Sequence, residues 1–416
     1  MKEAILERFL RYVAVTSQSD GKAGVVPSTE GQRKLAGMLA EELAELGFVN
    51  IEISEYSVLT ALLPGNLPDN KAVPTVGWCC HLDTVDAGLS PDVHPQVIRG
   101  YQGGDICLNK EKDLWMRTSE HPEIEKYVGD DIVVTDGTSV LGADNKSAIA
   151  NVMTAFDIVV KENRPHGDIY VAFVPDEEIG LLGAKKIDFS KFPVDFAYTV
   201  DCCELGEVVY ETFNAGSATI RIKGVTAHPM SSKGVLVNPT LIATDFVQMM
   251  DRGSTPECTE GTEGFVWVNS IVSNPSQATV SIKIRDHNRE KYEAKKELIA
   301  SAVEYLKVRN PRARIELEVK DMYGNIADAL TDDNRCAVDH LYRALEIAGL
   351  DCHARRHGRF LHLDAGRHHA QLLHGRPQLS QQLRIPAAWC GREEHGSDAH
   401  PDRPDCRHEA LRSGLL

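Results

Sequence analysis

Short apolar runs alternate with stretches of helical spacing through the first half of this chain, and this alternation restricts the fold more than any other feature. Apolar residues recur at helical spacing from a capping signal at Thr29 and Gln32 to a stop at Gly47, and again from about residue 146 to 162. Three apolar runs have the length of buried strands: residues 75–80, 169–174 and 196–200. Buried strands that alternate with helices predict an α/β sheet with helices on its faces.

The character of the chain changes near residue 213. Residues 217–223 and 279–285 alternate apolar and polar side chains, which is typical of half-exposed antiparallel strands. Helical spacing lies near residues 240–251 and 290–307, and a further helix is indicated near residue 335. We therefore expect a smaller α+β domain inserted into the α/β domain. The expected divisions are 1–211 and 324–351 for the two parts of the α/β domain, 212–323 for the insert and 352–416 for an aberrant tail.

Composition and charge exclude several classes of protein. With 416 residues, of which 42% are apolar and 25% charged, the chain has the composition of an ordinary globular protein of about two domains. It contains no apolar run of roughly 18–20 residues, so we expect no membrane-spanning helix. The net charge of −16 argues against a nucleic-acid partner. The charged N-terminus lacks the apolar core of a signal peptide, so we expect a cytoplasmic protein whose ten cysteines are reduced.

The last 65 residues differ in composition from the rest. Residues 352–416 hold 9 of the 16 histidines and 10 arginines, but no lysine, valine, threonine, tyrosine or asparagine. Such a segment lacks the β-branched residues that strands need. Three explanations are open at this point: a disordered basic tail, a histidine-rich metal-binding tract, or a translation that has left its reading frame.

Acidic and imidazole groups follow the apolar runs or open the helix after them. They are His81, Asp83, Asp144, Glu177, Glu178 and Asp201. In α/β sheets, ligands gather outside the carboxyl ends of the strands, so these side chains are expected to share one pocket. So many carboxylates would repel one another unless cations neutralise them. A mixture of imidazole and carboxylate suits zinc.

Each of these residues also has an ordinary explanation. A histidine at the end of a strand is more often a turn or core residue than a metal ligand, and adjacent glutamates are most often a solvated helix start. The cysteine pairs at residues 79–80 and 202–203 are expected to be buried thiols, since adjacent strand residues point to opposite faces and cannot ligate one ion. The metal hypothesis is favoured because four separate segments repeat the pattern.

These segments resemble the signatures of the co-catalytic dizinc peptidases, the group that includes aminoacylases and succinyl-diaminopimelate desuccinylases. Within that group the chain is similar to the peptidase T family of tripeptide aminopeptidases. The four main motifs lie at residues 81–85, 141–146, 173–180 and 198–201, and supporting motifs at 27–32, 99–106, 165–169 and 284–286. The resemblance extends from about residue 4 to residue 350. It implies a twisted mixed sheet with flanking helices, which carries an inserted α+β lid or dimerisation domain.

The resemblance also implies two zinc ions per subunit. Asp144 would bridge the two ions, His81 and Asp201 would bind one of them, and Glu178 would bind the other.

Two further carboxylates take catalytic roles by the same resemblance. Asp83 would fix the imidazole ring of His81, as metal-bound histidines usually require. Glu177 would be the general base that takes a proton from the attacking water and passes it to the leaving amine.

In the inserted domain, His228 matches the position at which a histidine of the partner subunit stabilises the oxyanion. Asn238 and Arg285 are candidates for holding the carboxylate of the substrate, although either could be structural. The sequence departs from the family pattern at Asn145, where a second aspartate is frequent, and at Met230, where glycine is frequent. A homodimer is expected from the same resemblance.

Two family elements are missing after residue 351: an Arg-Gly-Gly-Thr-Asp-Gly segment that lines the pocket, and a late histidine that completes the second zinc site. Back-translation of residues 355–363, shifted forward by one nucleotide, can be read as Gly-Gly-Thr-Asp-Gly-Ser-Phe-Ile-Ser. The same shift over residues 371–379 can give Asn-Phe-Phe-Thr-Gly-Gly-His-Asn-Phe, which supplies a histidine. We therefore predict a frameshift near Asp351, which resequencing of codons 345–360 would test.

The sequence as a whole predicts a metallo-aminopeptidase that removes the N-terminal residue from tripeptides. A related dizinc dipeptidase or N-acyl-amino-acid deacylase is the alternative among enzymes. An inactive or non-catalytic metal-binding protein is the alternative if the tail is real.

Overall fold

The structure is a computed structural model that describes residues 1–68, 73–201, 207–329, 336–347, 353–354 and 383–384. By their internal contacts the described residues form two compact units. The main unit holds residues 1–208 and the described residues after 330, and the small unit holds residues 209–329.

A mixed eight-stranded sheet forms the centre of the main unit, with the strand order β1-β2-β8-β3-β9-β16-β10-β15. β3 pairs in parallel with both β8 and β9, whereas β2 pairs antiparallel with β8. The strands are β1 (Val49–Ile53), β2 (Leu59–Leu63), β3 (Val76–His81), β8 (Ile169–Val174), β9 (Phe196–Val200), β10 (Glu207–Val209), β15 (His353–Ala354) and β16 (Leu383–Arg384). The parallel strands β3, β8 and β9 therefore end at the same edge of the sheet.

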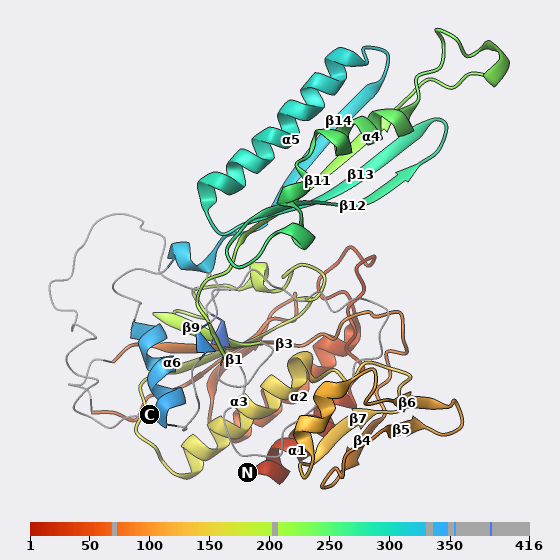
Figure 1. Ribbon diagram of the computed structural model, residues 1–416. Helices are drawn as coiled ribbons and strands as arrows, with labels where there is room; N and C mark the ends of the chain where they lie inside the picture. The colour runs from red at the N-terminus through yellow and green to blue at the C-terminus, as the bar shows by residue number, and fades with distance from the viewer. Residues whose placement is uncertain (69–72, 202–206, 330–335, 348–352, 355–382, 385–416) are drawn as a thin grey trace, which may run out of the picture. The chain divides into compact units, whose positions relative to one another are not determined.

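Helices cover this sheet (Figure 1). They are α1 (Lys2–Val13), α2 (Glu30–Glu45), α3 (Ala143–Lys161), α6 (Cys336–Ile347) and the short η2 (Ala184–Lys186). α3 packs on β3 and on α1, and α2 packs on β1 and β2. The main core lies between these helices and the sheet and includes the fully buried Phe9, Leu39 and Phe173. The predicted α/β class with strands at residues 75–80, 169–174 and 196–200 is confirmed.

Two small sheets in the main unit were not predicted from the sequence. They pair β4 (Pro95–Ile98) with β7 (Ile132–Thr135), and β5 (Ile106–Asn109) with β6 (Leu114–Met116), next to η1 (Pro122–Tyr127). They enclose a core of their own, with Ile106, Ile124 and Ile132 buried. Strands of three or four residues are too short for periodicity to reveal.

The small unit is a four-stranded antiparallel sheet in the order β12-β13-β11-β14, with two long helices packed against it (Figure 1). Its elements are β11 (Asn214–Lys223), η3 (Pro229–Ser231), α4 (Pro239–Met249), η4 (Arg252–Ser254), η5 (Pro256–Cys258), β12 (Phe265–Ser273), β13 (Gln277–Asp286), α5 (Arg289–Arg309), β14 (Arg314–Tyr323) and η6 (Ile326–Ala329). Alternate residues of the sheet, such as Ile220 and Ile282, pack with Phe246 of α4 and Val303 of α5 in a separate core. The predicted α+β character of this region is confirmed.

The capping box predicted at the start of α2 is wrong in its hydrogen bonds. Thr29 is the residue before the helix, but its hydroxyl makes no cap hydrogen bond and donates to the carbonyl of Gln18 instead. The side-chain amide of Gln32 still donates to the hydroxyl of Thr29 (3.1 Å), but its shorter hydrogen bonds are made with Asp176 (2.7 and 2.9 Å). Distant partners, the carbonyl of Gln18 for Thr29 and the buried Asp176 for Gln32, thus replace the hydrogen bonds of the predicted capping box.

No helix of the part of the chain described here is long and apolar enough to cross a bilayer. The frameshift predicted for the tail falls on residues 352–416, which lie outside the described residues except for the four in β15 and β16.

Candidate metal centre

Three of the predicted site segments meet at one edge of the main sheet. His81 is the last residue of β3 and lies opposite Val174, the last residue of β8. Glu177 and Glu178 follow three and four residues beyond that point, and Asp201 directly follows β9. The parallel pairing of β3 with β8 and β9 is what brings these segments together.

The fourth segment is the start of α3. Asp144, near its first residue, has φ −80° and ψ 105°, so its backbone is not helical. Its Oδ1 lies 2.9 Å from Nε2 of His81, which is buried, whereas the Asp144 side chain is 43% exposed. One carboxylate oxygen thus contacts the imidazole ring while the rest of the group faces outward.

Asp83 is fully buried and holds two parts of the site at once. Its Oδ1 lies 3.2 Å from Nδ1 of His81, and its two oxygens accept hydrogen bonds from the backbone amides of Glu177 (2.9 Å) and Glu178 (3.1 Å). The side chain predicted to fix the histidine ring therefore also fixes the turn that carries both glutamates.

His81, Asp144 and Glu178 form a group that could hold a metal ion, since one ligand atom of each lies within 4.8 Å of the others. One imidazole and two carboxylates match the donor set of zinc sites. Asp201 is not in this group. It is half-buried, and its charge raises the pKa of Glu177, so it lies near the same cluster.

The electrostatics of the cluster favour a cation. Burial raises the pKa of Glu177 to about 7 and that of Glu178 to about 8. Burial alone would lower the pKa of His81, but its hydrogen bonds to Asp144 and Asp83 raise it well above the ordinary value. The glutamates bind protons more readily than usual, and so does the histidine. The cluster therefore favours positive charge, which a divalent cation would also supply.

Two residues after Asp144 contribute contacts that sequence reasoning missed. The Asn145 side chain donates to the carbonyl of Val200 (2.6 Å) and accepts from the amide of His81 (3.3 Å), so it joins the ends of β9 and β3. Lys146 is buried, donates to the carbonyl of Val15, and has its pKa lowered to about 7 by burial. The departure from the family pattern at Asn145 marked this position in the sequence. Its contacts could not be predicted, because its partners Val200 and His81 lie in distant strands.

Cys79 and Cys80 are buried free thiols, as predicted, and pack in different cores on opposite faces of β3. Burial raises the pKa of both thiols, which keeps them protonated and unreactive. Residues 202–203 lie outside the described residues.

The other predicted site residues lie in the small unit. His228 is exposed on a loop, where its Nδ1 accepts from the amide of Met230. Asn238 caps α4 by accepting from the amide of Thr240, which gives it a structural role. Arg285 is buried.

The surroundings of Arg285 leave its charge without a carboxylate contact among its recorded partners. Its guanidinium donates to the carbonyls of Gly216 and Ile284 and lies over the rings of Phe213 and Tyr323. Burial lowers its pKa.

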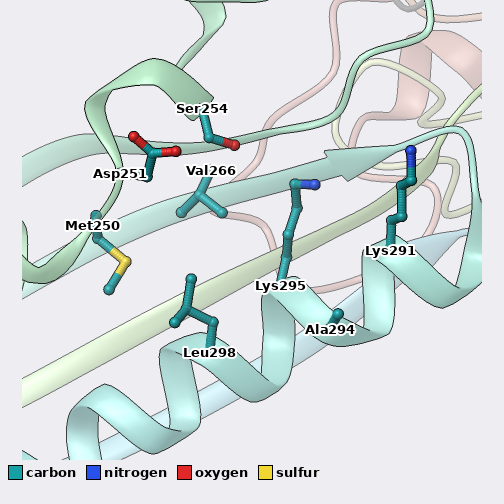
Figure 2. Close-up of a pocket in the computed structure, with 8 residues that line it drawn as sticks. All are labelled: Met250, Asp251, Ser254, Val266, Lys291, Ala294, Lys295 and Leu298. Atoms are coloured by element: carbon teal, nitrogen blue, oxygen red, sulfur yellow. The ribbon is translucent and has the colours of Figure 1, made fainter.

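A cavity of about 300 Å³ opens beside α5 in the small unit, as Figure 2 shows. It is lined by Met250, Asp251, Ser254, Val266, Lys291, Ala294, Lys295 and Leu298. None of the predicted site residues lines it, so it is separate from the cluster of the main unit.

The chain is similar to known proteins over most of its length. Residues 210–313 match the family described as "Peptidase dimerisation domain". A peptidase T-like protein of Yersinia pestis is 51% identical over 345 residues, which cover 83% of each chain. Peptidase T of Caldanaerobacter subterraneus is 43% identical and covers 83% of this chain and 84% of its own.

Among solved structures, aminopeptidase PepT of Bacillus cereus has a similar fold, with a TM-score of 0.67 at 19% identity. The match covers 93% of this chain and 90% of that one. At this identity the likeness concerns the fold alone.

Proposed function

Because the chain belongs to the peptidase T family, we propose that it is a metal-dependent aminopeptidase that removes the N-terminal residue from tripeptides. One observation carries the proposal: His81, Asp144 and Glu178 converge on a common point, with Glu177 beside them on the turn held by Asp83. A metal cluster next to a buried carboxylate is the arrangement that water-dependent amide hydrolysis needs.

The proposed cofactor is a pair of zinc ions. Asp144 would bridge the ions, His81 and Asp201 would complete one site, and Glu178 would contribute to the other. The donor types fit. Burial, and after it the charges of Asp144 and Glu177, raise the pKa of Glu178, so bound cations would favour its ionised form. When bound, such ions acidify water and polarise the scissile carbonyl.

Glu177 is the proposed general base. Its carboxylate is buried and near neutrality in pKa, so it can take a proton from water and release it to the leaving amine. Its backbone amide is held by Asp83, which keeps its position fixed during the transfer. Asp83 also orients His81, so that Nε2 faces Asp144 and not the protein interior.

The small unit supplies substrate-binding groups in this proposal. His228 would donate to the oxyanion from the partner subunit of a homodimer, a role supported by its exposed position and by the dimerisation-domain match. Arg285 would hold the carboxylate of the tripeptide, since its recorded contacts leave that charge without an acidic partner. Asn238 would assist from the start of α4.

The test is hydrolysis of a tripeptide by the full chain, measured before and after a chelator removes bound metal. Zinc is then added back stepwise, and turnover is measured at each step. Loss of turnover with chelator and recovery with about two zinc ions per chain is the expected result. Faster turnover of dipeptides or acetylated amino acids would favour the related peptidases and deacylases instead. A frame-restored chain assayed in parallel separates a failed mechanism from a damaged C-terminus, and light scattering at working concentration measures the dimer.

A further inference from the structure

The Pro-Ser-Thr-Glu-Gly-Gln segment at residues 27–32 lies against the turn that carries the two glutamates. The amide of Ser28 donates to Oδ2 of Asp176 (2.7 Å), and its hydroxyl donates to Oδ1. Gln32 donates from Nε2 to the same Oδ1 (2.7 Å) and accepts at Oε1 from the amide of Asp176 (2.9 Å). Ser28 and Gln32 thus hydrogen-bond both carboxylate oxygens and the backbone amide of one aspartate that lies 148 and 144 positions away from them in the sequence.

Asp176 is unusual in two respects. It is fully buried, and its φ of 55° lies in the left-handed region that few residues other than glycine adopt. A buried carboxylate is costly unless its oxygens are satisfied, and a strained backbone persists only where its surroundings hold it. The hydrogen bonds with Ser28 and Gln32 meet both requirements. They supply donors to both carboxylate oxygens of Asp176, and Gln32 also accepts from its backbone amide.

The turn beyond Asp176 is held from the opposite side as well. Asp83 accepts from the amides of Glu177 and Glu178, and the carbonyl of Glu177 accepts from the amide of Gly180 (2.9 Å). The glutamate pair therefore sits between two buried carboxylates, one that receives its amides and one that immediately precedes it. Movement of Asp176 would rotate the peptide that aims the Glu177 side chain.

We propose that Ser28 and Gln32, acting through Asp176, are positioning residues for Glu177 and Glu178. This inference rests on the proposed function for its catalytic consequence, but not for its structural one. A purely structural tie would affect the free energy of unfolding and leave the turnover of the folded enzyme unchanged. A positioning role changes kcat, because proton transfer depends on the direction of the base, while substrate binding and KM stay nearly constant.

The donor and acceptor pattern permits a swap experiment. In D176N, the new side-chain NH2 group lies opposite the donors of Ser28 and Gln32, so a hydrogen bond is lost. In Q32E, the new carboxylate lies opposite that of Asp176, and the two groups repel each other. Each single variant is expected to lower kcat by about 10- to 100-fold, with KM within about twofold. The double variant D176N/Q32E restores a donor opposite an acceptor and keeps the total charge, so its kcat is expected to return to within a few-fold of the wild type.

A second readout does not depend on catalysis. Amide hydrogen exchange across residues 175–183 is expected to be faster in each single variant and to recover in the double variant. The matched control is D168N, which makes the same substitution at the other end of β8, where Asp168 accepts from the amide of Gly65. It is expected to leave both kcat and exchange in the turn unchanged.

The outcomes separate the two proposals. If neither the chain nor its frame-restored form hydrolyses a tripeptide, the proposed function fails, and hydrogen exchange still tests the positioning role. Wild-type values of kcat and exchange in folded single variants would overturn the inference. A folded double variant that recovers neither quantity would do so too.

Discussion

Nε2 of His81 lies 2.9 Å from Oδ1 of Asp144, although 63 positions separate the two residues in the chain. The contact joins the end of a central strand to the start of the helix that packs upon it. The local structure around each residue does not explain this contact, because the two residues belong to different elements of the fold. The pairing therefore marks the place where the fold assembles the site.

Replacement of His81 by glutamine is expected to remove a metal ligand while keeping a polar side chain. Zinc per chain should fall, and turnover should fall by at least about 100-fold. The measurement is zinc content by elemental analysis beside a tripeptide assay. H94Q is the matched control, because the side chain of His94 is mostly exposed and lies 3.9 Å from the carboxylate of Asp136. Full zinc occupancy in H81Q would contradict the proposed ligand set.

The variant E177Q removes the proposed base without changing the shape of the side chain. We expect kcat to fall by about 10²- to 10⁴-fold, with zinc content and KM nearly unchanged. Steady-state kinetics with elemental analysis measures this. E41Q, at an exposed position of α2, serves as the control for loss of one negative charge. If E177Q retained wild-type kcat, the base would have to be another group.

The metal-free protein should lose stability as the pH rises from about 5 to 7. Burial raises the pKa of Glu177 and Glu178 above the ordinary value of 4.5, so the folded state holds protons that the unfolded state has released. Their contribution to stability is full below pH 4.5 and is lost as the pH rises through about 7 and 8. The raised pKa of His81 acts in the same direction, whereas the lowered pKa of Lys146 acts mainly above pH 7.

Zinc should cancel much of this loss, so its stabilising effect is expected to be larger at pH 7 than at pH 5.5. Melting temperatures of metal-free and zinc-loaded protein at both values provide the test. In E177Q/E178Q the metal-free melting temperature should vary less with pH. An equal pH dependence in this variant and the wild type would show that other groups dominate.

Because the small unit has a core of its own, we expect it to unfold separately from the main unit. Phe246 is fully buried between α4 and the sheet of the small unit, so F246A should destabilise that unit by about 3–5 kcal/mol. Amide exchange should rise across residues 214–323 and stay slow in β3 and β8. Zinc content should remain at the wild-type level. Uniform loss of protection in both units would indicate one cooperative core instead.

Arg285 predicts a preference for substrates with a free C-terminal carboxylate. In R285M, kcat/KM for a tripeptide should fall by about 10- to 100-fold, since a charged hydrogen bond contributes about 1.5–3 kcal/mol. The same tripeptide with an amidated C-terminus should be affected far less. R221M is the control, because Arg221 also lies in the small sheet but is exposed and pairs with Glu318. An equal loss on both substrates would assign Arg285 a structural role.

Local pattern was enough to predict the central strands. The apolar run at residues 75–80 predicted a strand that ends at His81, and the structure has β3 at Val76–His81. The run at residues 169–174 predicted β8 with the same bounds. Strands buried on both faces need continuous apolar residues, so their sequences are readable without knowledge of their partners.

The capping signal at Thr29 and Gln32 shows where local pattern failed. The spacing was right for a helix start, and α2 does begin at Glu30. The side chain of Gln32 nevertheless makes its shortest hydrogen bond with Asp176, because a buried carboxylate is costly unless its oxygens are hydrogen-bonded.

The sequence alone determined the strands β3, β8 and β9, the helices α2 and α3 and the types of residue at their ends, because these depend on the spacing of apolar side chains over a few turns or pleats. Tertiary structure decided which side chains meet. The contacts of Asp83 with His81 and with the amides after Asp176, the bridge of Asn145 between two strand ends and the burial that shifts the pKa of Glu177 all join segments far apart in the chain. Such contacts follow from strand order and sheet register, which no local window of residues contains.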